Sequence, residues 1–69
     1  MSKEDEQRTL LKIQIYHMVK YLIDAYKVTY KEALEKILHS KTYLHLLNNE
    51  LYLNQGSNYI LEDFKQELA

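Results

Sequence analysis

The chain has 69 residues, enough for one domain over residues 1–69 with a thin apolar core. It contains no cysteine, which excludes a disulfide framework, a thiol redox motif and the usual kinds of zinc finger. Nine Lys and Arg residues against ten Asp and Glu residues give a net charge of −1, so no strong field attracts nucleic acid or anionic lipid.

The absence of Pro and the presence of a single Gly favour long helices, because little interrupts them. Ser2, three residues before Asp5, can cap the start of a first helix. Apolar residues from Gln7 to Lys27 recur at the spacing of one helix face. They are Leu11, Ile15, Met18, Val19, Leu22, Ile23 and Tyr26. We therefore predict one amphipathic helix over this segment.

A second helix is predicted from about Tyr30 to His39. Thr29 and Glu32 have the spacing of a capping box, in which each side chain accepts a hydrogen bond from the other residue's backbone N–H. We expect an exposed ion pair between Glu32 and Lys36, four residues apart. The predicted inner face consists of Tyr30, Ala33, Leu34, Ile37 and Leu38.

A short third helix is predicted from about Thr42 to Asn48, with Ser40 or Thr42 as its cap. Its predicted inward residues are Tyr43, Leu44 and Leu47. Asn48 and Asn49 tolerate the left-handed conformation that ends many helices. Near residues 50–55 we expect an extended connector that buries Leu51 and Leu53 on one side.

Ser57 or Asn58 is predicted to cap a last helix that runs to about Leu68. Its apolar stripe is Ile60, Leu61, Phe64 and Leu68. Gly56 permits a positive φ where the chain turns into this helix. The sequence thus predicts an all-α domain, a compact bundle of about four helices, of which two are short.

No residue pattern indicates catalysis, so we expect neither an enzyme nor a bound cofactor or metal. His17, His39 and His45 are not spaced as two ligands on one helix face. Glu62 and Asp63 are adjacent on a helix and point about 100° apart, so they cannot act as a catalytic pair. The longest apolar runs are too short to span a membrane, and we expect a cytoplasmic protein.

Tyrosine is the unusual residue, with seven copies against one Phe and no Trp. Tyrosine is favoured where an apolar surface also meets water or a polar partner. On the first helix, Leu10, His17 and Tyr21 form a second seam away from the main stripe, with Ile13 beside them. One side of a helix in so small a domain reaches the core, so this seam predicts an interface. The predicted interface residues are Leu10, Ile13, Tyr16, His17, Tyr21 and Tyr52.

The segment from Leu51 to Phe64 resembles the C-terminal half of a group of short bacterial proteins classed as a domain of unknown function. These proteins share the pattern Gln-Gly-x-x-Tyr-Ile-(Val/Leu)-Glu-Asp. The matching residues are Gln55, Gly56, Tyr59, Ile60, Leu61, Glu62 and Asp63. Many members carry His-Thr before this pattern, where this chain has Leu53-Asn54. Their genes often lie beside genes for ADP-ribosyltransferase-like proteins, which implies a toxin and its antitoxin or accessory.

Two functions remain open on the sequence alone. The first is an antitoxin-like interaction protein that covers a partner, or a second copy of itself, with helix surface. The second is a helix-turn-helix DNA-binding regulator that uses Lys31, Lys36, Lys41 and His45. The chain has only one Arg, at position 8, and Arg is the commonest reader of bases. We therefore expect a protein partner or a homo-oligomer rather than nucleic acid or a membrane.

Overall fold

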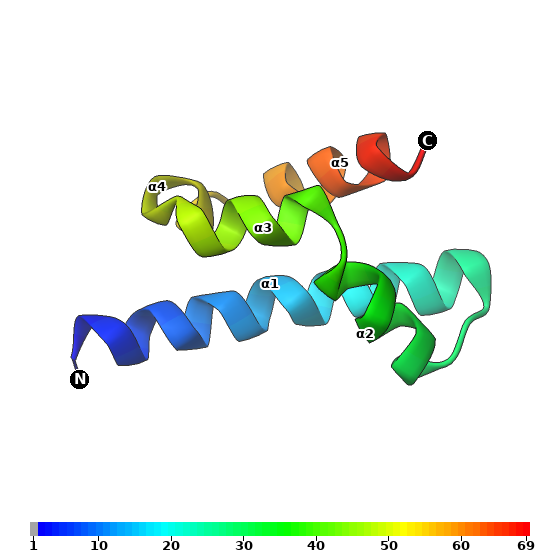
Figure 1. Ribbon diagram of the computed structural model, residues 1–69, viewed down its shortest axis with the longest axis horizontal. Helices are drawn as coiled ribbons and strands as arrows, with labels where there is room; N and C mark the ends of the chain where they lie inside the picture. Colours follow the sequence, from blue (N-terminus) through cyan, green and yellow to red (C-terminus); the bar gives the residue numbers. More distant parts are fainter. Residues whose placement is uncertain (1) are drawn as a thin grey trace.

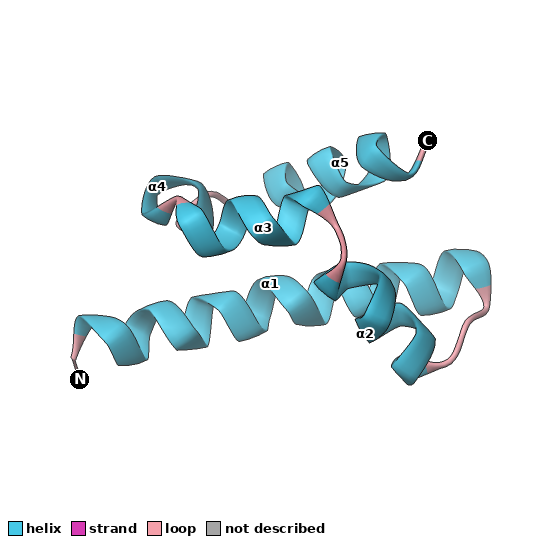
Figure 2. Cartoon of the chain, in the orientation of Figure 1, coloured by secondary structure: helices cyan, strands magenta, loops and turns pink. Residues whose placement is uncertain are grey.

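The computed structural model describes residues 2–69, and every regular element in this range is a helix (Figures 1 and 2). The helices are α1 (Lys3–Tyr26), α2 (Tyr30–Leu38), α3 (Lys41–Asn48), α4 (Glu50–Leu53) and α5 (Ser57–Leu68). The predicted all-α class is confirmed. The predicted number of about four helices is too low, because residues 50–53 form a helix of their own.

The long helix α1 forms one edge of a domain that measures 36 × 21 × 19 Å. Figure 1 shows α3, α4 and α5 together on one side of α1, while α2 crosses its C-terminal half. No helix among residues 2–69 runs along the opposite side of α1 in this view. The chain thus leaves one long face of its longest helix open.

The core lies where the four longer helices meet. Its fully buried large side chains are Met18, Leu22, Ile37, Leu46, Ile60 and Phe64. Ile60 and Phe64 confirm the stripe predicted for the last helix, and Met18 and Leu22 confirm that of the first. At roughly 1.5–3 kcal/mol for each fully buried large apolar side chain, these residues provide most of the driving force for folding.

The predicted inner face of α3 is wrong at two of its three residues. Leu44 and Leu47 are 57% and 53% exposed, whereas Thr42 and Leu46 are buried. Tyr43 is half-buried and packs against the core, as predicted. Thr42 turns inward because Glu67 of α5 accepts hydrogen bonds from both its backbone N–H and its hydroxyl, at 2.9 and 2.7 Å. This contact joins residues far apart in the sequence and fixes which face of α3 meets the core.

Three residues predicted on inner faces are also exposed. Tyr26 is 51%, Tyr30 63% and Leu38 46% exposed. Each lies at or near the end of its helix, where the helix extends past the core. The periodic pattern continues beyond the part of each helix that has a neighbour to pack against.

The predicted extended connector near residues 50–55 is wrong, because residues 50–53 form α4. Asn49 has an extended backbone, with φ −137°, instead of the left-handed conformation expected at the end of α3. Its side-chain oxygen accepts a hydrogen bond from the Tyr52 N–H at 3.1 Å and so caps α4. Within this helix Leu53 is buried, but Leu51 is 79% exposed.

Helix caps are predicted with mixed success. The capping box of Thr29 and Glu32 is confirmed, with both reciprocal hydrogen bonds present. Glu32 caps α2, and no ion pair links it to Lys36 within residues 2–69. The positive φ predicted for Gly56 is wrong: its φ is −62°, and it caps α5 in an extended conformation. The left-handed residue of residues 2–69 is Lys27, which ends α1 with φ 55°.

Candidate interaction surface

The open face of α1 carries two parallel rows of side chains, each built from residues four apart. Such rows are the ridges by which helices pack against one another. The inner row consists of Ile15, Val19 and Ile23. The outer row consists of Lys12, Tyr16, Lys20 and Asp24.

A groove of about 460 Å³ lies along these two rows, and Tyr30 of α2 completes its lining. Val19 is buried in its floor, Ile15 and Ile23 are half-buried, and the walls include Tyr16, which is 60% exposed. The loop between α1 and α2 is short, so α2 folds back beside α1 and brings Tyr30 to the groove. An apolar floor between amphipathic walls is a suitable surface for another helix.

The charged side chains of the outer row have no ionic partner within residues 2–69. The ion pairs in this range join Lys3 to Glu50 at 2.9 Å and Lys65 to Glu62 at 3.4 Å. Lys12, Lys20 and Asp24 are exposed and are therefore free to meet charges on a binding partner.

Three of the predicted interface residues lie on or beside this open face. Tyr16 lines the groove, and Ile13 is 43% exposed. His17 is half-buried, and its ring meets the Tyr16 ring edge-on, with 5.5 Å between centroids and 70° between planes. His17 thus supports one side of Tyr16.

The other three predicted residues turn toward the fold. Leu10 and Tyr21 are half-buried and pack against the core, and Lys65 of α5 lies 5.1 Å from the centre of the Tyr21 ring. Tyr52 is only 7% exposed. The Tyr21 end of the second seam thus packs against α5, so two sides of α1 are used inside one small domain.

The sequence placed Ile15 and Ile23 on the inner stripe of α1, and this prediction is confirmed, because both are half-buried and pack against the core. Tyr30 was also predicted on an inner face, but it is 63% exposed. A usable signal was Tyr30 itself, since a tyrosine at the start of a helix combines an apolar ring with a hydroxyl that prefers water. The exposed Tyr16 one row away from Ile15 belongs to the same pattern.

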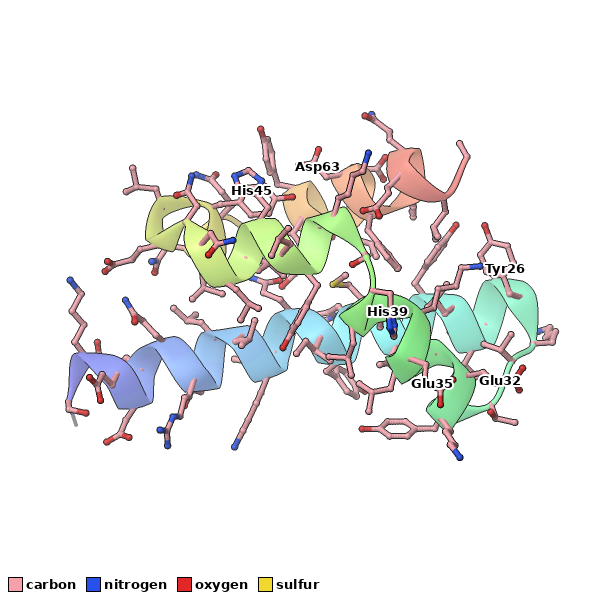
Figure 3. All side chains as sticks on the ribbon, viewed as in Figure 1. Tyr26, Glu32, Glu35, His39, His45 and Asp63 are labelled. Atoms are coloured by element: carbon pink, nitrogen blue, oxygen red, sulfur yellow. The ribbon has the colours of Figure 1, made fainter. Side chains whose placement is uncertain are left out.

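A second hollow, polar in character, lies between α3, α4 and α5. Tyr52 donates a hydrogen bond to Asp63 Oδ2 at 2.6 Å, and its ring stacks on His45 with 3.8 Å between centroids. Figure 3 shows His45 and Asp63 near each other on the side away from α1. Burial raises the pKa of the Tyr52 hydroxyl, and its hydrogen bond to Asp63 raises it further. A tyrosine held in its neutral form is poorly suited to act as a base. The contribution that the geometry supports is structural, because the hydrogen bond from Tyr52 to Asp63 joins α4 to α5.

A third hollow, around α2, contains Glu32, Glu35 and His39, with Tyr26 at its rim (Figure 3). Glu32 is engaged in the capping box. The hydrogen bond from the Thr29 backbone N–H lowers the pKa of the Glu32 carboxyl most, and the one from the Thr29 hydroxyl lowers it further. His39 donates from Nδ1 to the Glu35 carbonyl oxygen at 2.8 Å. No group of three or more His, Asp or Glu side chains within residues 2–69 is arranged to hold a metal ion.

Comparison of the chain with family models, curated proteins and solved structures finds no match. In the part of the chain that the structure describes, no helix is both long enough and apolar enough to cross a bilayer. The groove on α1 and α2 is therefore the feature from which a function is best argued.

Proposed function

We propose that this chain is a small cytoplasmic bacterial protein-interaction module that binds a partner helix in the groove on α1 and α2. The observation that carries this proposal is the groove itself. It is about 460 Å³, has a floor of Ile15, Val19 and Ile23, and is bordered by two tyrosines that are each about three-fifths exposed. Tyrosine is a common anchor of protein interfaces, because its ring is rigid and its hydroxyl stays hydrated until a partner arrives.

The dimensions of the groove favour a helix as the bound element. From Lys12 to Asp24 the outer row rises about 18 Å, at 1.5 Å per residue. That length accommodates about three turns of a partner helix, whose own row of residues four apart fits between the two rows of α1. The unpaired charges of the outer row would select a partner helix that carries both acidic and basic side chains.

The class of partner follows from the resemblance of residues 51–64 to proteins encoded beside ADP-ribosyltransferase-like genes. On that basis we propose an antitoxin-like or accessory role, in which the module covers a surface of its partner. The resembling segment has a structural anchor of its own. Gln14 of α1, which is buried, donates from Nε2 to the Gln55 carbonyl oxygen at 3.2 Å.

The DNA-binding alternative has less support. A recognition helix presents its N-terminus to phosphates and base edges. The N-terminus of α3 is instead occupied by the Glu67 carboxylate, which accepts from the Lys41 and Thr42 N–H groups at 2.7 and 2.9 Å. A negative charge at this place repels the phosphate backbone.

A matched pair of tyrosine variants tests the proposal. Tyr16 in the groove and Tyr59 on α5 are 60% and 58% exposed, so Tyr16→Glu and Tyr59→Glu make the same chemical change at similar exposure. Each tagged variant is isolated from its host beside the wild type. The proteins retained are quantified, and helicity is checked by circular dichroism.

We expect Tyr16→Glu to reduce the protein retained by the wild type, a second copy included, at least tenfold. Tyr59→Glu should retain it, because Tyr59 lies outside the groove. Equal retention by all three proteins would remove the groove from the account. Selective loss with Tyr59→Glu would move the interface to α5.

A further inference from the structure

We propose that the helix bound along the outer row of the groove is α1 of a second copy of this chain, paired antiparallel about a two-fold axis. This inference rests on the proposed function and names the partner. In the proposed register, the residue numbers of each facing pair on the two outer rows add up to 36. Lys12 then faces Asp24 of the second copy, and Tyr16 faces Lys20 of the second copy.

The charge pattern of the outer row complements itself when the row is reversed. Read forward the row is Lys12, Tyr16, Lys20 and Asp24, and all four side chains are exposed. Reversal brings opposite charges together at both ends of the pair, and the two-fold axis forms each contact twice. At the centre, each Lys20 ammonium lies over the Tyr16 ring of the other copy, which is a favourable cation–π contact.

The geometry of helix packing allows all four contacts at once. When two helices cross at about −50°, their rows of residues four apart become parallel. The two-fold axis then places the outer row of each copy over the outer row of the other, so that their long side chains meet. The pairing therefore covers the Tyr16 ring, which is 60% exposed in the single chain.

A second copy of α1 fits this surface better than an unrelated helix, because α1 itself carries both the lysine and the aspartate of the proposed ion pair. Lys12, Lys20 and Asp24 have no ionic partner within residues 2–69. A parallel pairing in register would instead place Lys12 against Lys12 and Lys20 against Lys20, which is repulsive. The row therefore specifies the direction of the second helix as well as its presence.

Zero-length carbodiimide cross-linking of the unmodified protein tests the register directly. This reagent joins an amine to a carboxylate that already touches it. Within one chain, Lys12 and Asp24 are about 18 Å apart along α1, so they cannot be joined. We expect a covalent dimer on a denaturing gel and a Lys12–Asp24 cross-linked peptide by mass spectrometry.

Charge reversal tests the same contact by energetics. We expect Lys12→Asp and Asp24→Lys each to weaken dimerisation at least tenfold in sedimentation equilibrium, because each change converts two attractions into two repulsions. The double variant Lys12→Asp/Asp24→Lys should restore dimerisation to within about threefold of wild type. Lys31→Asp, an exposed charge change outside the groove, is the control and should have no such effect.

Failure of this inference is distinguishable from failure of the proposed function. A protein that stays monomeric at every concentration, or a double variant as weak as the single ones, would overturn the pairing. If Tyr16→Glu still abolished binding of a different protein in that case, the groove would remain the interaction surface. A dimer without the Lys12–Asp24 cross-link that is insensitive to Tyr16→Glu would count against both.

Discussion

The Glu67 carboxylate joins the C-terminal part of α5 to the start of α3. Its carboxylate accepts three hydrogen bonds from the start of α3, from the Lys41 N–H, the Thr42 N–H and the Thr42 hydroxyl. Partial burial raises the pKa of this carboxyl, but the hydrogen bonds from Lys41 and Thr42 outweigh it, and the pKa is lowered from 4.5. One side chain thereby fixes the rotation of α3 and its attachment to α5.

We expect Glu67→Gln to reduce the free energy of unfolding by about 1–2 kcal/mol at neutral pH, because a neutral amide offers one oxygen and no charge. Urea denaturation followed by circular dichroism measures the change. Glu35→Gln, which makes the same change of charge at an exposed carboxylate without an ion pair within residues 2–69, is the control for an altered net charge. Equal stability of Glu67→Gln and wild type would show that this contact does not stabilise the fold.

The lowered pKa of Glu67 also predicts a dependence of stability on pH. A carboxyl whose pKa is lower in the folded state stabilises the fold above its unfolded pKa of about 4.5. That contribution is lost as the pH falls below this value, through the folded pKa. Thermal melts should therefore show a midpoint that falls on acidification from pH 5. Glu67→Gln should show a smaller fall, and an identical fall in both proteins would contradict the assignment.

Neither the backbone conformation nor the surroundings of Gly56 require a glycine at this position. Its φ of −62° is open to any residue, and a side-chain carbon added there would meet no atom within 4 Å. It caps α5 without a side-chain hydrogen bond. We expect Gly56→Ser to stabilise the fold by about 0.5–1 kcal/mol, because serine adds a cap and restricts the unfolded chain. A higher melting temperature checks this, and a loss of stability would show that the turn needs glycine.

At the scale of the elements, prediction from sequence succeeds where local signals and packing agree. The first, second and last helices have clear apolar stripes, and all three form with nearly the predicted bounds. The third helix also forms where predicted, with Ser40 as its cap, but the last helix is capped by Gly56 and not by Ser57 or Asn58. The prediction fails for the face of α3 that turns inward and for α4, because both depend on contacts made by α5. Thr42 is held by Glu67, twenty-five residues away, and Tyr52 by Asp63, eleven residues away. Hydropathy along one segment contains no information about either partner.

The attachment of α4 gives a further prediction. The hydrogen bond from the Tyr52 hydroxyl to Asp63 has a length of 2.6 Å and joins a four-residue helix to α5. We expect Tyr52→Phe to cost about 1–2 kcal/mol of unfolding free energy, because a hydrogen bond to a carboxylate is lost from a buried side chain. Tyr59→Phe is the matched control, since its hydroxyl has no hydrogen bond within residues 2–69. Equal stability of the two variants would contradict a structural role for this bond.

At the scale of the whole molecule, the candidate site was predictable only in part. The sequence indicated that α1 is apolar on more than one side, and the structure agrees. The sequence could not indicate which side of α1 stays open, because that depends on where α5 lies. Since Leu10 and Tyr21 pack against the core, the exposed surface shifts to Tyr16 and the row around it. Ile13 and Tyr16 belong to both the predicted and the observed surface.

Within residues 2–69 the exposed leucines of α3 and α4 form a rival apolar surface. Leu44, Leu47 and Leu51 are between 53% and 79% exposed. A face of this kind also favours association, since larger contiguous apolar patches mark interaction sites. The two faces lie on different helices, so a measurement resolved by residue separates them.

The most direct test of the central claim is therefore an amide chemical-shift titration of the ¹⁵N-labelled protein from micromolar to millimolar concentration. The account predicts shifts that depend on concentration at residues 12–24 and at Tyr30, and their loss in Tyr16→Glu. Shifts confined to residues 44–51, or unchanged spectra in a protein that nevertheless self-associates by sedimentation, would contradict the assignment of the groove as the interaction surface.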